Sequence, residues 1–174
     1  MAGALWSGDD RRRARPLFAD LLRAVGEVEG IRRVRYTSPH PKDFRPETAA
    51  AMAEVPTVCE HLHLPLQSGS DRVLAAMHRG YTAERYLEKL AVARQHIDDL
   101  AVTTDLIVGF PGETEADFET TLEVVAAAEY DAAYTFIFSP RDGTEAAEMT
   151  DDFVPHGVSV ARFDRLRAVL ERSG

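Results

Sequence analysis

Hydrophobic positions along the chain follow two different spacings in turn. Four short segments have the two-residue alternation or the apolar run that predicts a strand, namely 31–37, 61–67, 102–108 and 133–138. The segments between them have the three- and four-residue spacing of amphipathic helices. Strands that are separated by helices in this way predict parallel βα units, and therefore the α/β fold class.

The helical segments have recognisable starts and ends. The first has Leu17, Leu21, Val25 and Val28 at helical spacing and is predicted to end at Gly30. Further helices are predicted at 46–54, 70–78 and 82–98, then after Gly112 and again around Phe163, Leu166 and Leu170. The helix after Gly112 begins with a predicted capping box, Thr114 with Asp117.

Each predicted strand runs into a polar or glycine-rich turn. These turns lie at 37–38, 67–70, 109–113 and 139–144. Ligands of barrels and open α/β sheets bind at the carboxyl ends of the strands, where such turns meet. The sequence therefore predicts one site, formed where the four turns converge.

Composition limits what the chain can be. Its 174 residues, 45% hydrophobic and 28% charged, are ordinary for about one globular domain. No apolar run approaches the roughly 18 residues of a membrane span, and Asp9 and Asp10 interrupt the place of a signal peptide. We therefore expect a cytoplasmic protein.

Charge and cysteine content exclude two further classes. The net charge of −9 argues against this chain being the main nucleic-acid-binding surface, because such domains are usually basic. The one cysteine, Cys59, excludes an internal disulfide and a cluster site built from this chain's own thiolates. We interpret Cys59 as a small buried hydrophobic residue.

Several polar residues near the strands have both a binding and a structural interpretation. His61 and His63 could present two metal ligands, but hydrogen-bonded histidines are favoured because no third ligand is evident. Asp105 lies inside an apolar strand, so it is either functional or hydrogen-bonded. Ser70 is suited to cap the next helix, and Arg141 could bind a carboxylate or phosphate or remain a surface arginine.

Taken together, four blocks resemble a known family. RVRYTSPHP (33–41), HLHLPLQSGSDRVLAAMHRGYT (61–82), TTDLIVGFPGETEADF (103–118) and FSPRDGTEAAEM (138–149) are similar to the radical S-adenosylmethionine methylthiotransferases. The blocks occur in the family's order over residues 17–172. The first two are typical of the branch that adds a methylthio group to isopentenyl-adenosine beside the tRNA anticodon.

The resemblance implies a partial chain. Full members carry a cysteine-rich N-terminal domain, a C-x-x-x-C-x-x-C loop after the first barrel strand and a C-terminal RNA-binding domain, whereas this chain has only Cys59. It implies a flexible lead-in over 1–16 and, over 17–174, strands three to six of a partial (βα)6 TIM-like radical SAM barrel. The catalytic residues and metal ligands would then lie outside this chain, which alone would be inactive.

The resemblance also implies a cofactor cradle. S-adenosylmethionine would be bound by Ser38, Gln67 and Ser68 at its polar parts, and by Ile107, Gly109 and Phe110 beside its adenine. Arg141 would pair with its carboxylate or with a substrate phosphate, and Asp105 would orient either ligand. The 4Fe–4S clusters would be held by segments that this chain lacks.

Three functions remain open at this point. The first is part of a tRNA methylthiotransferase for isopentenyl-adenosine, whose family forms a 5′-deoxyadenosyl radical. The second is a methylthiotransferase for another tRNA adenosine or a ribosomal protein, and the third is a non-catalytic truncated barrel fragment. The expected partners are tRNA, bound weakly by this acidic chain, and either the missing N-terminal segment or a second copy.

Overall fold

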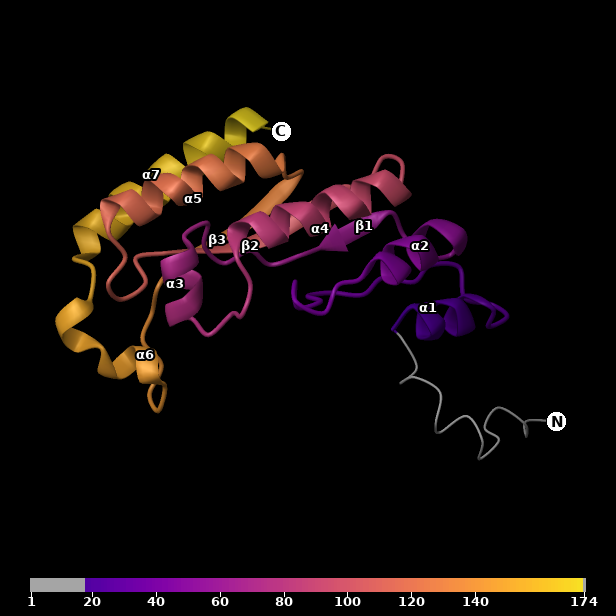
Figure 1. Ribbon diagram of the computed structural model, residues 1–174, viewed down its shortest axis with the longest axis horizontal. Coiled ribbons are helices and arrows are strands. Elements are labelled where there is room, and N and C mark those ends of the chain that lie inside the picture. The colour runs from indigo at the N-terminus through magenta and orange to yellow at the C-terminus, as the bar shows by residue number, and fades with distance from the viewer. Residues whose placement is uncertain (1–17, 174) are drawn as a thin grey trace.

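The chain forms a layer of helices on a small parallel sheet. The computed structural model describes residues 18–173, so the predicted lead-in at 1–16 lies outside the described residues. Figure 1 shows the elements, whose bounds are α1 Phe18–Gly26, α2 Pro46–Glu54, β1 His61–His63, α3 Asp71–Ala76, α4 Ala83–His96, β2 Ala101–Val108, α5 Glu115–Ala128, β3 Ala132–Ile137, α6 Glu145–Glu148, a 3₁₀ turn Thr150–Asp152 and α7 His156–Ser173.

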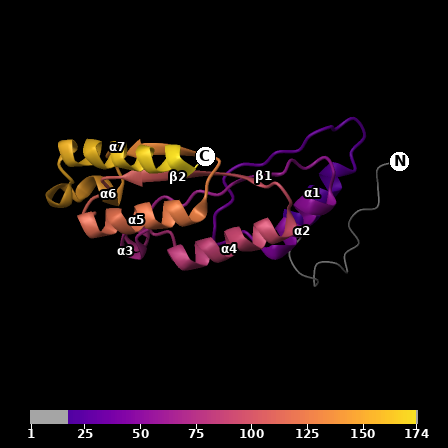
Figure 2. The same cartoon turned by 90° about the horizontal axis from the view of Figure 1, so that it is seen from above.

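The sheet has three parallel strands in the order β1-β2-β3. Helices α4, α5 and α7 run along the strands, as seen from above in Figure 2. Leu106 and Val108 of β2 are fully buried on the helix side of the sheet. The predicted α/β class and the parallel pairing of the strands are confirmed. The described sheet is open.

The predicted first strand, 31–37, is wrong. Only Val34 is paired there: its amide donates to the carbonyl of Thr57 at 2.7 Å and its carbonyl accepts from the amide of Cys59 at 3.0 Å. The partner segment turns just before Val58 and bends at Glu60, so it offers one residue for pairing. The described sheet thus has three strands, and Cys59 beside this bridge is partly exposed instead of buried.

The predicted strand 61–67 is interrupted in its middle. Pro65 has no amide proton for the ladder, and β1 ends at His63. The hydroxyl of Thr104 fills the gap, because it accepts from the amide of Leu66 at 2.9 Å and donates to the carbonyl of Leu64 at 3.0 Å. Pairing resumes at Gln67, which forms a parallel bridge with Leu106 of β2 and so keeps the end of the segment in register.

The first helix differs from its predicted stripe. Helix α1 ends at Gly26, four residues before Gly30, and buries Ala19 and Leu22, whereas Leu21 is 55% exposed. A Cβ at Gly26 would lie 2.3 Å from the Val55 side chain, so the end of α1 approaches the end of α2 closely. This close contact fixes which face of α1 is buried.

The remaining predicted helices are confirmed with small changes of boundary. Helix α2 begins and ends where expected, Ser70 caps α3, and Thr114 and Asp117 form the capping box of α5. Helix α6 and the 3₁₀ turn were not predicted. In residues 18–173, every helix is too short or too polar to cross a membrane.

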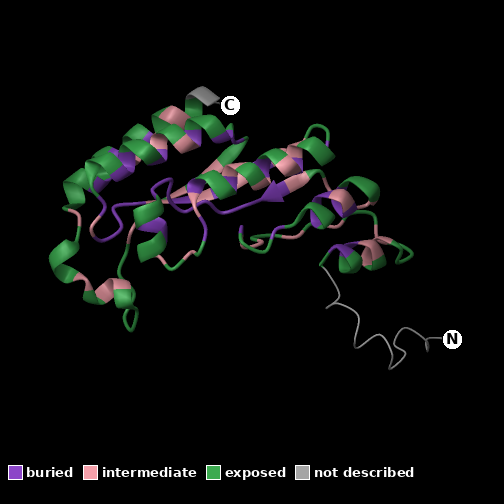
Figure 3. Ribbon diagram, in the orientation of Figure 1, coloured by how far each residue is buried: buried purple, intermediate pink, exposed green. Residues whose placement is uncertain are grey.

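Within residues 18–173, one face of the sheet has no helical layer. Thr103, Asp105 and Ile107 of β2 face this side, in register with β3, where Tyr134 is 61% and Phe136 51% exposed. Figure 3 shows buried residues concentrated on β1, β2 and the inner sides of the helices. Parallel sheets normally have both faces covered, so this open face is the natural place to look for a site.

Candidate functional site

A cavity of about 580 Å³ lies at the carboxyl ends of the strands, on the open face. Its volume is within the range of small-molecule sites. Five of the residues singled out from the sequence line it, namely Gln67, Asp105, Ile107, Phe110 and Arg141. The structure therefore brings together three of the four predicted turns at this cavity.

The backbone is strained around this site. Gln67 and His78, which line the first cavity, and Ser38, at a second cavity, have positive φ angles of 71°, 56° and 54°. Non-glycine residues adopt this conformation at a cost, and such positions concentrate at functional sites. The backbone of Gln67 is held there by hydrogen bonds to Asp105 and Ile107.

The second cavity, of about 410 Å³, adjoins the first through Asp105, which lines both. Ser38 lines this second cavity together with His61 and His63, so the first predicted turn lies beside the main cavity and not in its wall. Both histidines are hydrogen-bonded to Thr103, as expected. Among residues 18–173, no cluster of three or more His, Cys, Asp or Glu could hold a metal ion.

Ser68 and Gly109 lie away from both cavity walls. Ser68 is fully buried, and its hydroxyl contacts that of Thr121 at 3.3 Å and accepts from the amide of Ser70. Gly109 has φ +73°, and a Cβ there would lie 2.3 Å from the hydroxyl of Ser159 on α7. In this structure both residues position turns, and a ligand contact from either stays a prediction.

One carboxylate, Asp117, ties two of the turns together. It accepts hydrogen bonds from Ser70, Thr114 and Arg72, and Arg72 also donates to the carbonyl of Gly112 at 2.6 Å. Burial raises the pKa of Asp117, but these hydrogen bonds together outweigh it and hold that pKa far below its usual range. Asp117 therefore links the start of α3 to the turn before α5.

Replacing Asp117 with asparagine will cost about 1.5–3 kcal/mol of unfolding free energy, because charge-assisted hydrogen bonds are lost. A depressed carboxyl pKa stabilises the fold above the unfolded-state pKa of about 4, and this contribution disappears as the pH falls. As the pH falls below about 4, the free energy of unfolding should therefore decrease less in the variant than in the parent chain. Urea unfolding across the acid range measures both effects.

Asp164→Asn is the matched control, because Asp164 is exposed on α7. It should change unfolding by no more than a few tenths of a kcal/mol, as surface substitutions do. If both variants behaved alike at every pH, Asp117 would not anchor the turns.

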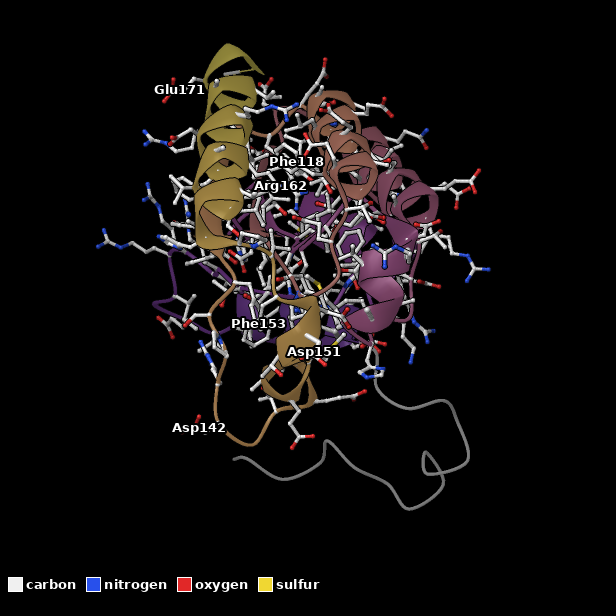
Figure 4. All side chains as sticks on the ribbon, turned by 90° about the vertical axis from the view of Figure 1, so that its left-hand side faces the viewer. Phe118, Asp142, Asp151, Phe153, Arg162 and Glu171 are labelled. Atoms are coloured by element: carbon white, nitrogen blue, oxygen red, sulfur yellow. The ribbon has the colours of Figure 1, made fainter. Side chains whose placement is uncertain are left out.

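A buried ion pair holds the turn at 109–113. Arg162 of α7 pairs with Glu113 at 2.9 Å, and both side chains are almost completely buried. Glu113 also accepts from the amide of Gly109 at 2.8 Å. Burial raises the pKa of Glu113 despite these partners, and Phe118 packs beside Arg162, as Figure 4 shows.

Sequence reasoning missed one wall of the main cavity. Glu145 belongs to the unpredicted helix α6, and Met149 is the residue after it. Both lie opposite Met77 and His78, which follow the end of α3. Nε2 of His78 lies 3.0 Å from Glu145 and joins the two sides. The block 138–149 is one of the sequence motifs, but its helix has only four residues and is too short to give a periodic signal.

The chemistry of the main cavity is mixed. Ile107, Phe110 and Phe136 form an apolar surface, while Asp105 and Arg141 supply opposite charges. The guanidinium of Arg141 makes no ion pair within residues 18–173, so it is available to an anionic ligand. The cavity suits a ligand with a flat apolar part, a hydroxylated part and a carboxylate or phosphate.

Comparisons with known proteins show which family the sequence matches. The model of the Radical SAM superfamily matches residues 3–125. The tRNA-2-methylthio-N(6)-dimethylallyladenosine synthase 1 of Mycobacterium marinum is 55% identical over 92% of this chain and 30% of its own length. The synthases of Salinispora arenicola and Corynebacterium urealyticum are 56% and 51% identical over 88% and 98% of this chain.

The chain spans about 30% of the length of these relatives. Among solved structures, the radical SAM enzyme coproporphyrinogen III oxidase of Escherichia coli aligns with a TM-score of 0.67. It is 20% identical and covers 79% of this chain, while the chain covers 32% of it. This likeness concerns the fold.

Proposed function

Because this chain belongs to the radical SAM superfamily, we propose that it forms strands three to six of the partial (βα)6 barrel of a tRNA methylthiotransferase. The first of these strands is reduced here to the bridge at Val34. The enzyme adds a methylthio group to isopentenyl-adenosine next to the anticodon. The observation that carries this proposal is the 51–56% identity to synthases of that name over about nine tenths of the chain.

S-adenosylmethionine is the cofactor that this superfamily implies, and the main cavity fits it. Ile107 and Phe110 would border the adenine, and Gln67 would bind the polar part of the nucleoside. Arg141 would pair with the carboxylate, and Asp105 would orient the ribose or the amino group. Ser38 would contribute from the second cavity, and the bound cofactor supplies the radical chemistry.

The residues of this chain do not fit a 4Fe–4S cluster. Such clusters are held by several cysteine thiolates, and the chain has one cysteine, Cys59, at the bridge to Val34. We therefore assign the cluster ligands to other segments of the complete enzyme. This chain would supply the wall that positions cofactor and substrate, and alone it would not catalyse the reaction.

tRNA is the substrate partner in this proposal. The net charge of −9 disfavours strong binding of a phosphate backbone by this chain. Most of the RNA contact would therefore come from other segments of the complete enzyme, which we expect to be cytoplasmic. Another tRNA adenosine or a ribosomal protein remains as an alternative substrate. The alternative to an enzyme part is a truncated barrel fragment that has no catalytic role.

Replacing Arg141 with methionine will weaken binding of S-adenosylhomocysteine, a non-reactive analogue, by about 1.5–3 kcal/mol, the value of a hydrogen bond to a charged group. NMR titration of the isotope-labelled chain measures the affinity. It also shows whether the shifts perturbed by the ligand belong to Ile107 and Phe110.

Arg85→Met on the exposed side of α4 is the control and should leave the affinity unchanged. Equal affinities of the Arg141→Met variant and the parent chain, or perturbations confined to residues outside the cavity, would contradict the proposed cradle.

A further inference from the structure

One wall of the main cavity has no role in the proposed cofactor cradle. It is formed by the end of α3 and by α6, which lie close together in Figure 1 and are joined by His78 and Glu145, whose nearest atoms are 3.0 Å apart. The cradle residues come instead from β2, from the turns after the strands and from the loop at 139–144. Four apolar residues of the helical wall line the cavity, namely Ala76, Met77, Ala146 and Met149.

This helical wall is made of small and adaptable side chains. Met77, Ala146 and Met149 are half-buried, although they line an open cavity. A methionine side chain is unbranched and polarizable, so it adapts to apolar groups of irregular shape. The nearest charged side chains, His78 and Glu145, are paired with each other. The wall therefore suits a flexible hydrocarbon group.

The substrate of the proposed reaction carries such a group. In the name of the relatives, tRNA-2-methylthio-N(6)-dimethylallyladenosine synthase, the methylthio group belongs to C2 of the adenine and the five-carbon dimethylallyl group to N6. These two positions leave the six-membered ring in different directions. In the proposed function C2 is the carbon that is modified, so it faces the cofactor in its cradle. The N6 group then leads away from the cradle.

We propose that Met77 and Met149 form the subsite for the N6-dimethylallyl group of the substrate adenosine. The inference rests on the proposed function and deepens it, because it names the residues that select a prenylated nucleoside. Burying about half of a five-carbon group at about 0.8 kcal/mol for each carbon favours binding by about thirtyfold. This factor separates the prenylated nucleoside from unmodified adenosine.

The test is carbon NMR of the full chain labelled at its methionine methyl groups, with S-adenosylhomocysteine both present and absent. The chain has four methionines, so the spectrum is simple. N6-dimethylallyladenosine should shift the signals of Met77 and Met149 and leave that of Met52, which is 2% exposed, unchanged. Adenosine has the same ring without the hydrocarbon group. It should shift neither signal and bind about thirtyfold more weakly.

Two variants remove the subsite from either side. Met149→Gln keeps the length of the side chain but puts an amide against the hydrocarbon group. It should weaken binding of N6-dimethylallyladenosine by about tenfold, because the amide loses water without gaining a partner. The affinities for adenosine and S-adenosylhomocysteine should not change. Met77→Gln makes the same change beside α3, and it replaces Met149→Gln should that variant fail to fold.

Leu21→Gln is the matched control. It puts the same amide in place of an apolar side chain of α1 that is 55% exposed and does not line the cavity. It should leave all three affinities unchanged.

Two outcomes would overturn the subsite while the cofactor cradle stands. Equal affinities for the prenylated and the unmodified nucleoside, in a chain that binds S-adenosylhomocysteine, would mean that the helical wall selects nothing. Methionine shifts caused by S-adenosylhomocysteine alone, with none from the added nucleoside, would mean that this wall serves the cofactor. The opposite result, in which the prenylated nucleoside binds at both methionines and S-adenosylhomocysteine does not bind, would support the subsite and contradict the cradle.

Discussion

Replacing Arg162 with methionine will lower the free energy of unfolding by about 3–5 kcal/mol, because removing one partner leaves a buried charge uncompensated. The charge is that of Glu113, whose Oε2 accepts from Arg162 and whose Oε1 is buried without a hydrogen-bond partner in the described structure. Urea unfolding followed by circular dichroism measures the loss. A second substitution, Glu113→Gln, should recover part of it.

Arg165→Met is a close control. Arg165 lies on the same helix and its guanidinium also stacks on Phe118, 5.0 Å from the ring centroid, but it is 45% exposed and pairs with Glu115 and Glu119 at the surface. Exposed pairs contribute about 0–1 kcal/mol. Equal losses in the two variants would show that stacking, and not the buried pair, holds α7 to the turn at 109–113.

The second large effect is expected at the open face of the sheet. Tyr134 and Phe136 are more than half exposed there, and covering one such aromatic side chain is worth about 1.5–3 kcal/mol. We expect the purified chain to dimerise or aggregate through this face. We also expect its melting temperature to rise when the preceding βα segment of a relative is added in trans.

Analytical ultracentrifugation with parallel thermal melts tests this expectation. Tyr134→Ser together with Phe136→Ser should shift the chain towards monomer, whereas Val160→Ser on α7, an exposed apolar residue outside the open face, should not. A parent chain that is monomeric at all concentrations and unaffected by the added segment would mean that this fold is complete as it stands.

Local sequence signals predicted the regular elements well. Helix α2, the strand β2 and the capping box of α5 follow from spacing and end residues that act within a few positions. The segment 31–37 has a similar apolar alternation but forms only one bridge, because pairing depends on the partner at 55–60, which turns away. Strand formation is a property of two segments, and the sequence of one does not determine it.

The site was predictable to the level of turns and less so to the level of side chains. Gln67, Asp105 and Arg141 line the main cavity, and their binding of a cofactor stays a prediction. Ser68 is adjacent to Gln67 in sequence, yet its side chain is buried against α5, where Gly69 lets the turn approach so closely that a Cβ would lie 2.6 Å from the Thr121 backbone. The direction of one side chain in a strained turn depends on packing from distant elements, which local patterns do not carry.

His61, His63 and Thr103 illustrate the same limit. Alternation along 61–67 placed both histidines on one face, and the structure confirms their hydrogen bonds. The register of β1 against β2, which puts Thr103 between them, came only with the fold.

The proposed function requires that this chain can serve as the matching part of a tRNA methylthiotransferase for isopentenyl-adenosine. The direct measurement exchanges the matched segment of the Mycobacterium marinum synthase, 55% identical over 160 residues, for this chain. The chimera is expressed in a bacterial strain deleted for its own synthase, and tRNA nucleosides are analysed by mass spectrometry. We predict that the methylthio derivative of dimethylallyl-adenosine appears, whereas a folded, cluster-loaded chimera that leaves this nucleoside unmodified would contradict the proposed function.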